Sequence, residues 1–406
     1  MRRKNSYQAE GVEVKTRITG TIMIVLFLSI VLVFSIMCGI IFGSSELSVS
    51  SVLNVLKSKL FGIAVEDVPS SAFYIVWNLR LPRVLLALAA GGGLAVCGAA
   101  MQAVTQNVLA DPYILGVSSG ASVMVSLAFF LNGVLIVSRA AISGFAFVGA
   151  LFSMLLVFAI GGIGKVSSGS RLVLSGMAIN IMLTAISQFF ITLSTEHATR
   201  NITLWMMGSV SGGRWNNIAL PISVSILGLI LLLLRARAYN LISLGDETAI
   251  SMGVKPSNLK RFTAVTVAIV TGIIVSNCGL IGLVGFVIPH IVRLISGPDH
   301  RRLIPVSFYA GAIFLVWMDM LARYVMAPAE LPIGIFTAMC GAPFFIMLLA
   351  KRFPVNCPTA RWRLCACSAR EKPMPRLPKN SMWRNPRCGH TLTECWKKQV
   401  IQTATA

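Results

Sequence analysis

The chain has 406 residues, of which 56% are hydrophobic and only 12% charged, and its mean hydropathy is +0.79. This composition excludes a soluble domain and predicts an all-α, polytopic membrane protein. The formal net charge of +21 does not indicate nucleic-acid binding, because lysines and arginines that gather in connections and tails follow from the positive-inside rule.

The N-terminal part predicts a short cytoplasmic segment followed by a membrane helix. Residues 1–18 are polar and basic, which is typical of the cytoplasmic side. Residues 22–42 form an apolar stretch long enough to cross a bilayer. Its apolar core is too long for a signal peptide and no small-residue cleavage site follows, so we interpret it as a retained first helix.

Nine further apolar stretches follow, which makes about ten membrane spans in all. An even number of spans predicts that both termini are cytoplasmic. The further spans are expected at about 83–104, 113–132, 140–162, 171–194, 217–236, 261–277, 280–296, 303–326 and 333–350.

A polar break separates two of these spans. Residues 84–101 carry no charge and are rich in Gly and Ala, a composition that lets helix backbones approach closely in lipid. The break at 102–112 includes Gln102, Asn107 and Asp111. Polar backbone at a helix end is typical of a cavity lining or its cytoplasmic mouth. From the residues alone, an ordinary hairpin between two membrane helices is the favoured interpretation.

The longest hydrophilic connection on the predicted cytoplasmic side covers residues 235–261. A short helix is expected over 244–249, with Asp246 and Glu247 in its positive N-terminal turn and Gly253 after its end. From the residues alone, this helix is either a docking element or a solvated linker.

A second glycine-rich stretch lies at 279–293. Gly279, Gly282 and Gly285 are expected to give a small-residue face. Pro289 interrupts the hydrogen bonding of the same apolar run, which suits a bent, gate-forming helix.

No metal site or cofactor is expected. His290 stands alone without a cysteine or carboxylate at ligand spacing, so we interpret it as a packed structural residue. The tail at 353–406 is polar, basic and cysteine-rich, and we expect it to be disordered or to derive from a frameshift. Its cysteines and histidine fit no common structural zinc spacing. They are Cys365, Cys367, Cys388, His390 and Cys395.

Several motifs between about residues 20 and 352 resemble the permease family of ABC importers for iron–siderophores, haem and cobalamin. They read R-x-P-R, G-x-x-M-Q, L-G-D-E-x-A, P-H-x-x-R, D-x-x-x-R, E-L-P-x-G and G-A-P-x-F. The resemblance implies the ABC type II importer permease fold, in the cell membrane of a bacterium. It also implies import of a bulky metal chelate. An iron–siderophore is favoured, and haem or cobalamin is the alternative.

The same resemblance implies three protein partners: a separate cytoplasmic ABC ATPase, an extracytoplasmic solute-binding protein, and a second permease copy or paralogue. ATP hydrolysis would belong to the ATPase, so the chain itself is not expected to be an enzyme. Residues 161–166 lack the glycine and the Ser or Thr of a phosphate-binding loop. An ion-driven secondary transporter is the other reading, and it is disfavoured because Asp319 is the only acid deep in an apolar span.

Arg80, Arg83 and Arg323 are expected to dock the solute-binding protein. They fall on the predicted outer side, against the positive-inside trend, and near helix ends from which they should reach water. In the resembled family, matching arginines pair with glutamates of the binding protein. Contact with lipid headgroups is the alternative.

The resemblance also assigns coupling and pathway residues. Within the segment 241–254, coupling to the ATPase is expected of Leu244, Gly245, Asp246, Glu247, Ala249 and Gly253. The candidates for the pathway or its gate are Gly98, Met101, Gln102, Asn107, Gly116, Gly120, Gly282, Gly285 and Pro289.

Overall fold

The computed structural model describes residues 2–352, apart from residues 44 and 46 and the segments 63–68, 133–137 and 162–168. The chain divides into two units, residues 1–349 and 350–406, and the contacts below lie within the first. The tail from residue 353, with the expectations placed on it, lies outside the described residues. Throughout the described part all regular structure is helical, which confirms the predicted fold class.

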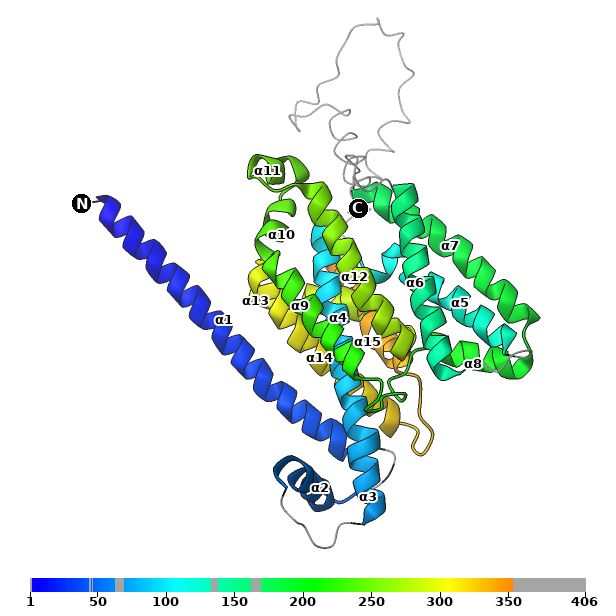
Figure 1. Ribbon diagram of the computed structural model, residues 1–406. Coiled ribbons are helices and arrows are strands. Elements are labelled where there is room, and N and C mark those ends of the chain that lie inside the picture. The colour runs from blue at the N-terminus through cyan, green and yellow to red at the C-terminus, as the bar shows by residue number, and fades with distance from the viewer. Residues whose placement is uncertain are drawn as a thin grey trace, which may run out of the picture. The chain divides into compact units, whose positions relative to one another are not determined.

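Each predicted span contains a helix (Figure 1). These helices are α1 (Arg2–Ile41), α4 (Leu81–Val104), α5 (Val117–Leu131), α6 (Arg139–Gly161), α7 (Gly169–Leu193), α9 (Ala219–Leu234), α12 (Pro256–Cys278), α13 (Val284–Ser296), α14 (His300–Tyr324) and α15 (Ile333–Arg352).

The number of complete spans is a separate question from the number of apolar helices. Among the described residues, six helices are long and apolar enough to cross a membrane. The count rises to seven if α9 and α10 (Ala236–Ile242), which are bent by 58° against each other, are taken as one span. The apolar stretches of α5, α13 and α15 have 10–17 residues, whereas a candidate span needs at least 18. The predicted span at 113–132 begins with a 3-10 helix, and the one at 280–296 begins with non-helical backbone. A multi-pass membrane protein is therefore confirmed, while the number ten stays a prediction.

Short helices occupy the connections. The polar stretch after α1 contains α2 (Val49–Phe61), α3 (Ser70–Tyr74) and the π-helix η1 (Ile75–Arg80), and the last two continue directly into α4. The 3-10 helix η2 (Pro112–Leu115) precedes α5, and α8 (Glu196–Met206) follows α7. The predicted cytoplasmic connection holds α10 and α11 (Asp246–Ser251).

The helix α4 is the centre of the fold. It packs most extensively on α14 and also contacts α9, α12 and α13. Glycines permit these contacts, because a methyl group at Gly91 would overlap the backbone oxygen of Gly311, and the reverse also holds. Close backbone packing of this kind holds helices together where burial from water contributes little.

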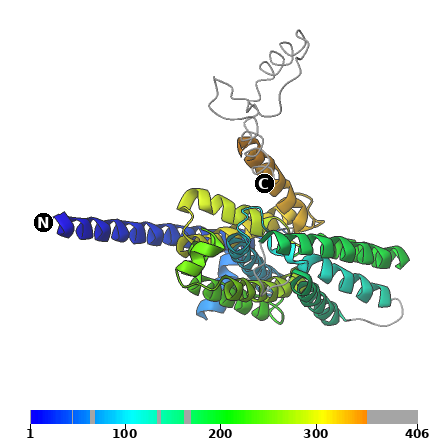
Figure 2. The ribbon, with the colours of Figure 1, turned by 90° about the horizontal axis from the view of Figure 1, so that it is seen from above.

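A second group of helices comprises α5, α6 and α7, which lie side by side in the view from above (Figure 2). Gly120 on α5 and Gly149 on α6 approach so closely that a methyl group on either would overlap the backbone oxygen of the other. The helix α6 also packs on α12, which connects this group to the α4 core.

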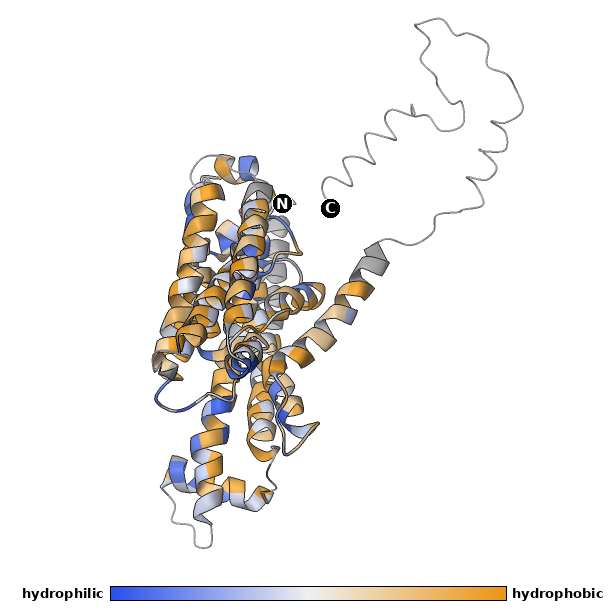
Figure 3. Cartoon of the chain, turned by 90° about the vertical axis from the view of Figure 1, so that its right-hand side faces the viewer, coloured by the Kyte–Doolittle hydropathy of each residue, from blue (hydrophilic) through white to orange (hydrophobic). Residues whose placement is uncertain are grey.

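Hydrophilic residues gather at the two ends of the helix bundle (Figure 3). One end carries α2 and α3, and we call it the α2 end; the other carries α11 and is called the α11 end (Figure 1). The helices α7 and α15 expose many large apolar side chains. They are Leu174, Met177, Ile181, Met182, Ile186, Phe189 and Leu193 on α7, and Met339, Ile346 and Met347 on α15.

Candidate functional site

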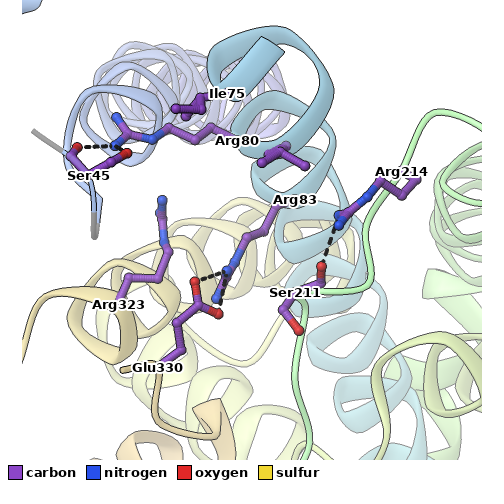
Figure 4. Close-up of a pocket in the computed structure, with 9 residues that line it drawn as sticks. Ser45, Ile75, Arg80, Arg83, Ser211, Arg214, Arg323 and Glu330 are labelled. Carbon is purple, nitrogen blue, oxygen red and sulfur yellow. Dashed lines mark hydrogen bonds and ion pairs between the residues drawn. The ribbon is translucent and has the colours of Figure 1, made fainter. Parts of the chain in front are cut away.

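A pocket of about 490 Å³ opens at the α2 end. Four arginines and one glutamate surround it, so its wall is strongly basic (Figure 4). The charged residues come from η1, α4, α14 and two loops, and they are Arg80, Arg83, Arg214, Arg323 and Glu330. We call this set the arginine pocket.

Two acids hold Arg83 inside the arginine pocket. Its Nε lies 2.9 Å from Asp319 Oδ1, and its Nη1 lies 2.8 Å from both carboxylate oxygens of Glu330. Asp319 is 1% exposed and also lies 3.1 Å from the Nε of Arg323. A buried charge is tolerated only when it is paired, and here the pairs link α4, α14 and the loop before α15.

The other two predicted docking arginines donate hydrogen bonds to backbone carbonyls at the C-terminus of α1. Arg80 Nη1 donates to the carbonyls of Ile40 and Ile41 at 2.8 and 2.7 Å. Arg323 donates from Nη1 and Nη2 to the carbonyls of Phe42 and Gly39, at 3.1 and 2.9 Å. The last carbonyls of a helix have no partner within it, and a positive charge is favourable there. Both arginines therefore stabilise the position of α1.

The expectation that all three arginines reach water is wrong for the isolated chain. Arg80, Arg83 and Arg323 are 5%, 8% and 2% exposed. Arg80 and Arg83 also bind different partners: Arg80 binds carbonyls at the end of α1, whereas Arg83 binds two acids of α14 and the loop after it. Arg214, which was not among the predicted docking residues, is the exposed cation of the arginine pocket. In the sequence, the one feature that could have indicated Arg214 as a docking residue is its positive charge on the predicted outer side.

At the α11 end, the predicted short helix is confirmed as α11, with both acids in its first turn. Gly245 and Gly253 flank it with φ of 117° and 82°, values that glycine adopts without strain. Ala249, which belongs to α11, is buried, whereas Leu244, which precedes the helix, is 70% exposed.

The two acids of α11 have different surroundings. Asp246 Oδ2 lies 2.6 Å from Lys260 Nζ, and its Oδ1 accepts a hydrogen bond of 3.1 Å from Gln106 Nε2. Asp246 therefore anchors α11 to α12 and to the segment after α4. Glu247 is exposed and is the acid of this pair that a partner can contact.

Some of the predicted pathway residues meet where α4 crosses α13. A methyl group at Gly98 would overlap the backbone oxygen of Gly285, so the two helices touch there. Gln102 Nε2 donates to the Phe286 carbonyl at 3.2 Å, and Met101 is fully buried. Pro289 lies inside α13 one turn further along.

The remaining pathway candidates lie away from the crossing of α4 and α13, or make no close helix contact. Gly116, with φ of 76°, and Gly120 pack near Ser153 of α6. Asn107 Oδ1 accepts a bond from the Leu109 amide within its own turn. Gly282 has open space where a side chain would begin, so the expected small-residue face does not include it.

A second pocket of about 490 Å³ lies at the α11 end. Gln102, Gln106, Leu244, Arg293 and Asp299 are among its lining residues, so it borders both the coupling segment and α13. Burial disfavours the charged form of Asp299. Hydrogen bonds and nearby arginine charges outweigh that effect, and they hold the pKa of this carboxyl below its usual value.

The fold and both ends define a class of protein: a multi-pass helical membrane protein with a basic pocket at one end and a short helix with two acids in its first turn at the other. The chain belongs to the FecCD transport family, which it matches over residues 30–351. This confirms the resemblance noted from the sequence.

Three relatives illustrate the range of the family. The cobalamin import permease BtuC of Halobacterium salinarum is 39% identical over 285 residues, covering 70% of this chain and 76% of that protein. The hemin transport permease HmuU of Yersinia pestis is 38% identical, covering 70% and 85%. The Fe(3+)-citrate import permease YfmD of Bacillus subtilis is 34% identical, covering 83% and 97%.

A solved structure agrees with this assignment. It is a metal-chelate type ABC transporter in an inward-facing conformation, with a TM-score of 0.70 and 28% identity over 81% of this chain and 99% of that chain. The chain is accordingly a permease of the ABC importers for metal chelates.

Proposed function

We propose that this chain is the membrane-spanning subunit of an importer that moves a bulky iron chelate, an iron–siderophore, into the cytoplasm. Haem and cobalamin are the alternative cargoes, as carried by the relatives named above. A separate ATPase would supply the energy. One observation carries the proposal: the central helix α4 runs from the arginine pocket at the α2 end to α10 at the opposite end, and α10 leads into α11.

The distribution of positive charge supports a cytoplasmic α11 end. Lysines and arginines cluster around α10, the start of α12 and the start of α14, where the positive-inside rule expects them. They are Arg235, Arg237, Lys255, Lys260, Arg301 and Arg302. In this orientation the arginine pocket faces the outside and both termini are cytoplasmic.

The α11 surface supports docking of the ATPase. Leu244, Ile250 and Met252 are 70%, 61% and 64% exposed around the short helix. A partner protein that covers them would remove apolar surface from water. The coupling role of the segment 241–254 is therefore part of the proposal.

The arginine pocket supports docking of a solute-binding protein through acidic side chains. Arg83 is the best placed of the three predicted arginines, because its partner Glu330 is 36% exposed and lies at the rim. A carboxylate of the binding protein would compete with Glu330 for the same guanidinium. Arg214 adds an exposed charge beside it, while Arg80 and Arg323 shape the pocket wall.

The exposed apolar faces of α7 and α15 support a second copy of the permease. The helix α15 packs on α13 through Phe344 and Phe345, whereas its Met339, Ile346 and Met347 are exposed, and it extends away from the other helices in Figures 2 and 3. Two copies or a paralogous pair would enclose the pathway between these faces.

Reconstitution tests the function directly. The permease, its ATPase and its binding protein are placed in proteoliposomes, and uptake of labelled ferric siderophore, haem and cobalamin is compared with and without ATP. We expect ATP-dependent uptake of one chelate class. Uptake that follows an ion gradient and persists with a catalytically inactive ATPase would overturn the proposal in favour of a secondary transporter.

A further inference from the structure

Two glutamines, Gln102 in the last turn of α4 and Gln106 just after its end, bind two different elements of the fold. Gln106 Nε2 donates to the Ile242 carbonyl at 2.9 Å and to Asp246 Oδ1 at 3.1 Å, which are the end of α10 and the start of α11. Gln102 Nε2 donates to the Phe286 carbonyl of α13 at 3.2 Å. Gln106 follows Gln102 by four positions across the C-terminus of α4, so one short stretch of chain binds both the coupling segment and α13.

The backbone at Gln106 ends α4. Gln106 has a φ of 53°, the left-handed conformation common just past a helix C-terminus, which glycine adopts without strain. The Gln106 and Asn107 amides donate to the Ala103 and Gln102 carbonyls at 3.3 and 3.2 Å, as in a helix C-terminal cap. With the backbone held in this way, the Gln106 side chain is directed to the coupling segment.

Gln102 binds α13 next to the place where Pro289 removes one of the backbone hydrogen bonds of that helix. Pro289 has no amide hydrogen, so the Gly285 carbonyl one turn earlier lacks its helical donor. Gln102 binds the neighbouring carbonyl of Phe286, and Gly98 touches the backbone of Gly285. Among the described residues, the Oε1 atom of Gln102 is buried and has no hydrogen-bond partner. Within this part of the chain, the hydrogen bond of the Gln102 amide therefore goes to α13.

We propose that Gln102 and Gln106 are positioning residues that transmit movement of the ATPase-facing segment 242–246 to the proline-containing helix α13. The inference rests on the proposed function, because it assumes that an ATPase moves this segment. Displacement of α11 would pull the end of α4 through Gln106, and Gln102 would carry that displacement to the helix that Pro289 weakens.

Two substitutions remove the bonds with little other change. Gln106→Gly keeps the left-handed backbone and deletes the side chain. Gln102→Met keeps most of the volume and removes the donor. Thr105→Val is the matched control, because the Thr105 hydroxyl donates to the Met101 carbonyl within α4 and contacts neither partner element.

The test uses the whole reconstituted importer and measures uptake per ATP hydrolysed. We expect both glutamine variants to assemble and to hydrolyse ATP, while uptake per ATP falls about fivefold or more, as for a coupling energy of ordinary size. Thr105→Val should keep the wild-type ratio. Uptake per ATP in the double variant should be no lower than in the more severe single variant, because the two bonds act in series.

Unchanged uptake per ATP in both single variants would overturn the proposal. Loss of ATPase binding in Gln106→Gly alone would also overturn it, because Gln106 would then only build the docking surface. If the wild-type permease fails to bind any ATPase, the proposed function fails instead, so the two failures are distinguishable.

Discussion

Arg83 and Asp319 form a buried ion pair, with 2.9 Å between Nε and Oδ1, across the contact of α4 with α14. These helices form the most extensive helix contact in the fold, and Gly91 and Gly311 bring their backbones together further along it. Asp319 also lies 3.1 Å from Arg323, which in turn binds the end of α1. One carboxylate thus connects three helices at the α2 end.

Asp319→Asn should therefore act on stability. The substitution leaves two buried arginines with less compensation, and removal of one partner of a buried pair costs about 3–5 kcal/mol. Thermal unfolding of the detergent-solubilised permease measures this. A stable Asp319→Asn protein that has lost ATP-independent, gradient-driven uptake would instead identify Asp319 as an ion-coupling acid and favour the secondary transporter.

Arg80→Ala should loosen α1 without removing a docking contact. It deletes the bonds to the Ile40 and Ile41 carbonyls, and the loss of a buried charged hydrogen bond costs about 1–3 kcal/mol. We expect a lower melting temperature and unchanged affinity for the binding protein in the folded fraction. An affinity that falls sharply in a fully stable Arg80→Ala variant would assign Arg80 to docking itself.

Glu330→Gln should strengthen docking of the binding protein. The neutral side chain competes less well for Arg83, so a carboxylate of the partner gains access to the guanidinium. Surface plasmon resonance should record a severalfold higher affinity that weakens as salt rises. Arg214→Glu is the opposing variant and should slow association, since exposed charges at an interface mainly govern encounter. If neither substitution alters binding, the arginine pocket is not the docking site.

Substitution of the two acids of α11 should have different effects. Glu247→Lys changes an exposed residue of the first turn, where charge contributes only about 0.3–1 kcal/mol to the helix, so the fold should persist. We expect reduced co-purification of the ATPase. Asp246→Asn should instead loosen the anchoring of α11 to Lys260. This segment would then become more protease-sensitive. Normal ATPase binding by Glu247→Lys would contradict the coupling assignment.

Gly98→Ala should disrupt the crossing of α4 and α13. The added methyl group overlaps the Gly285 backbone oxygen, and overpacking of this kind costs about 1–3 kcal/mol. Gly282→Ala is the control, because nothing lies within 4 Å of the position a methyl group would take there. Equal melting temperatures for the two variants would show that the close contact is unimportant.

The sequence by itself determined the class of the protein and the position of its helices. Apolar length and charge placement are local properties, so the spans and the all-helical fold follow from them. The short helix α11 was also predictable, because its acids and flanking glycines lie within a few residues of one another.

Only the tertiary structure decided what the predicted site residues contact. Arg83 and Asp319 are 236 residues apart, Gln102 and Phe286 are 184 apart, and Gln106 and Asp246 are 140 apart. No local pattern records which distant carboxylate or carbonyl an arginine or a glutamine binds. The same residues that read as exposed docking charges are therefore buried in the folded chain, because α1 and α14 bring carbonyls and acids to them.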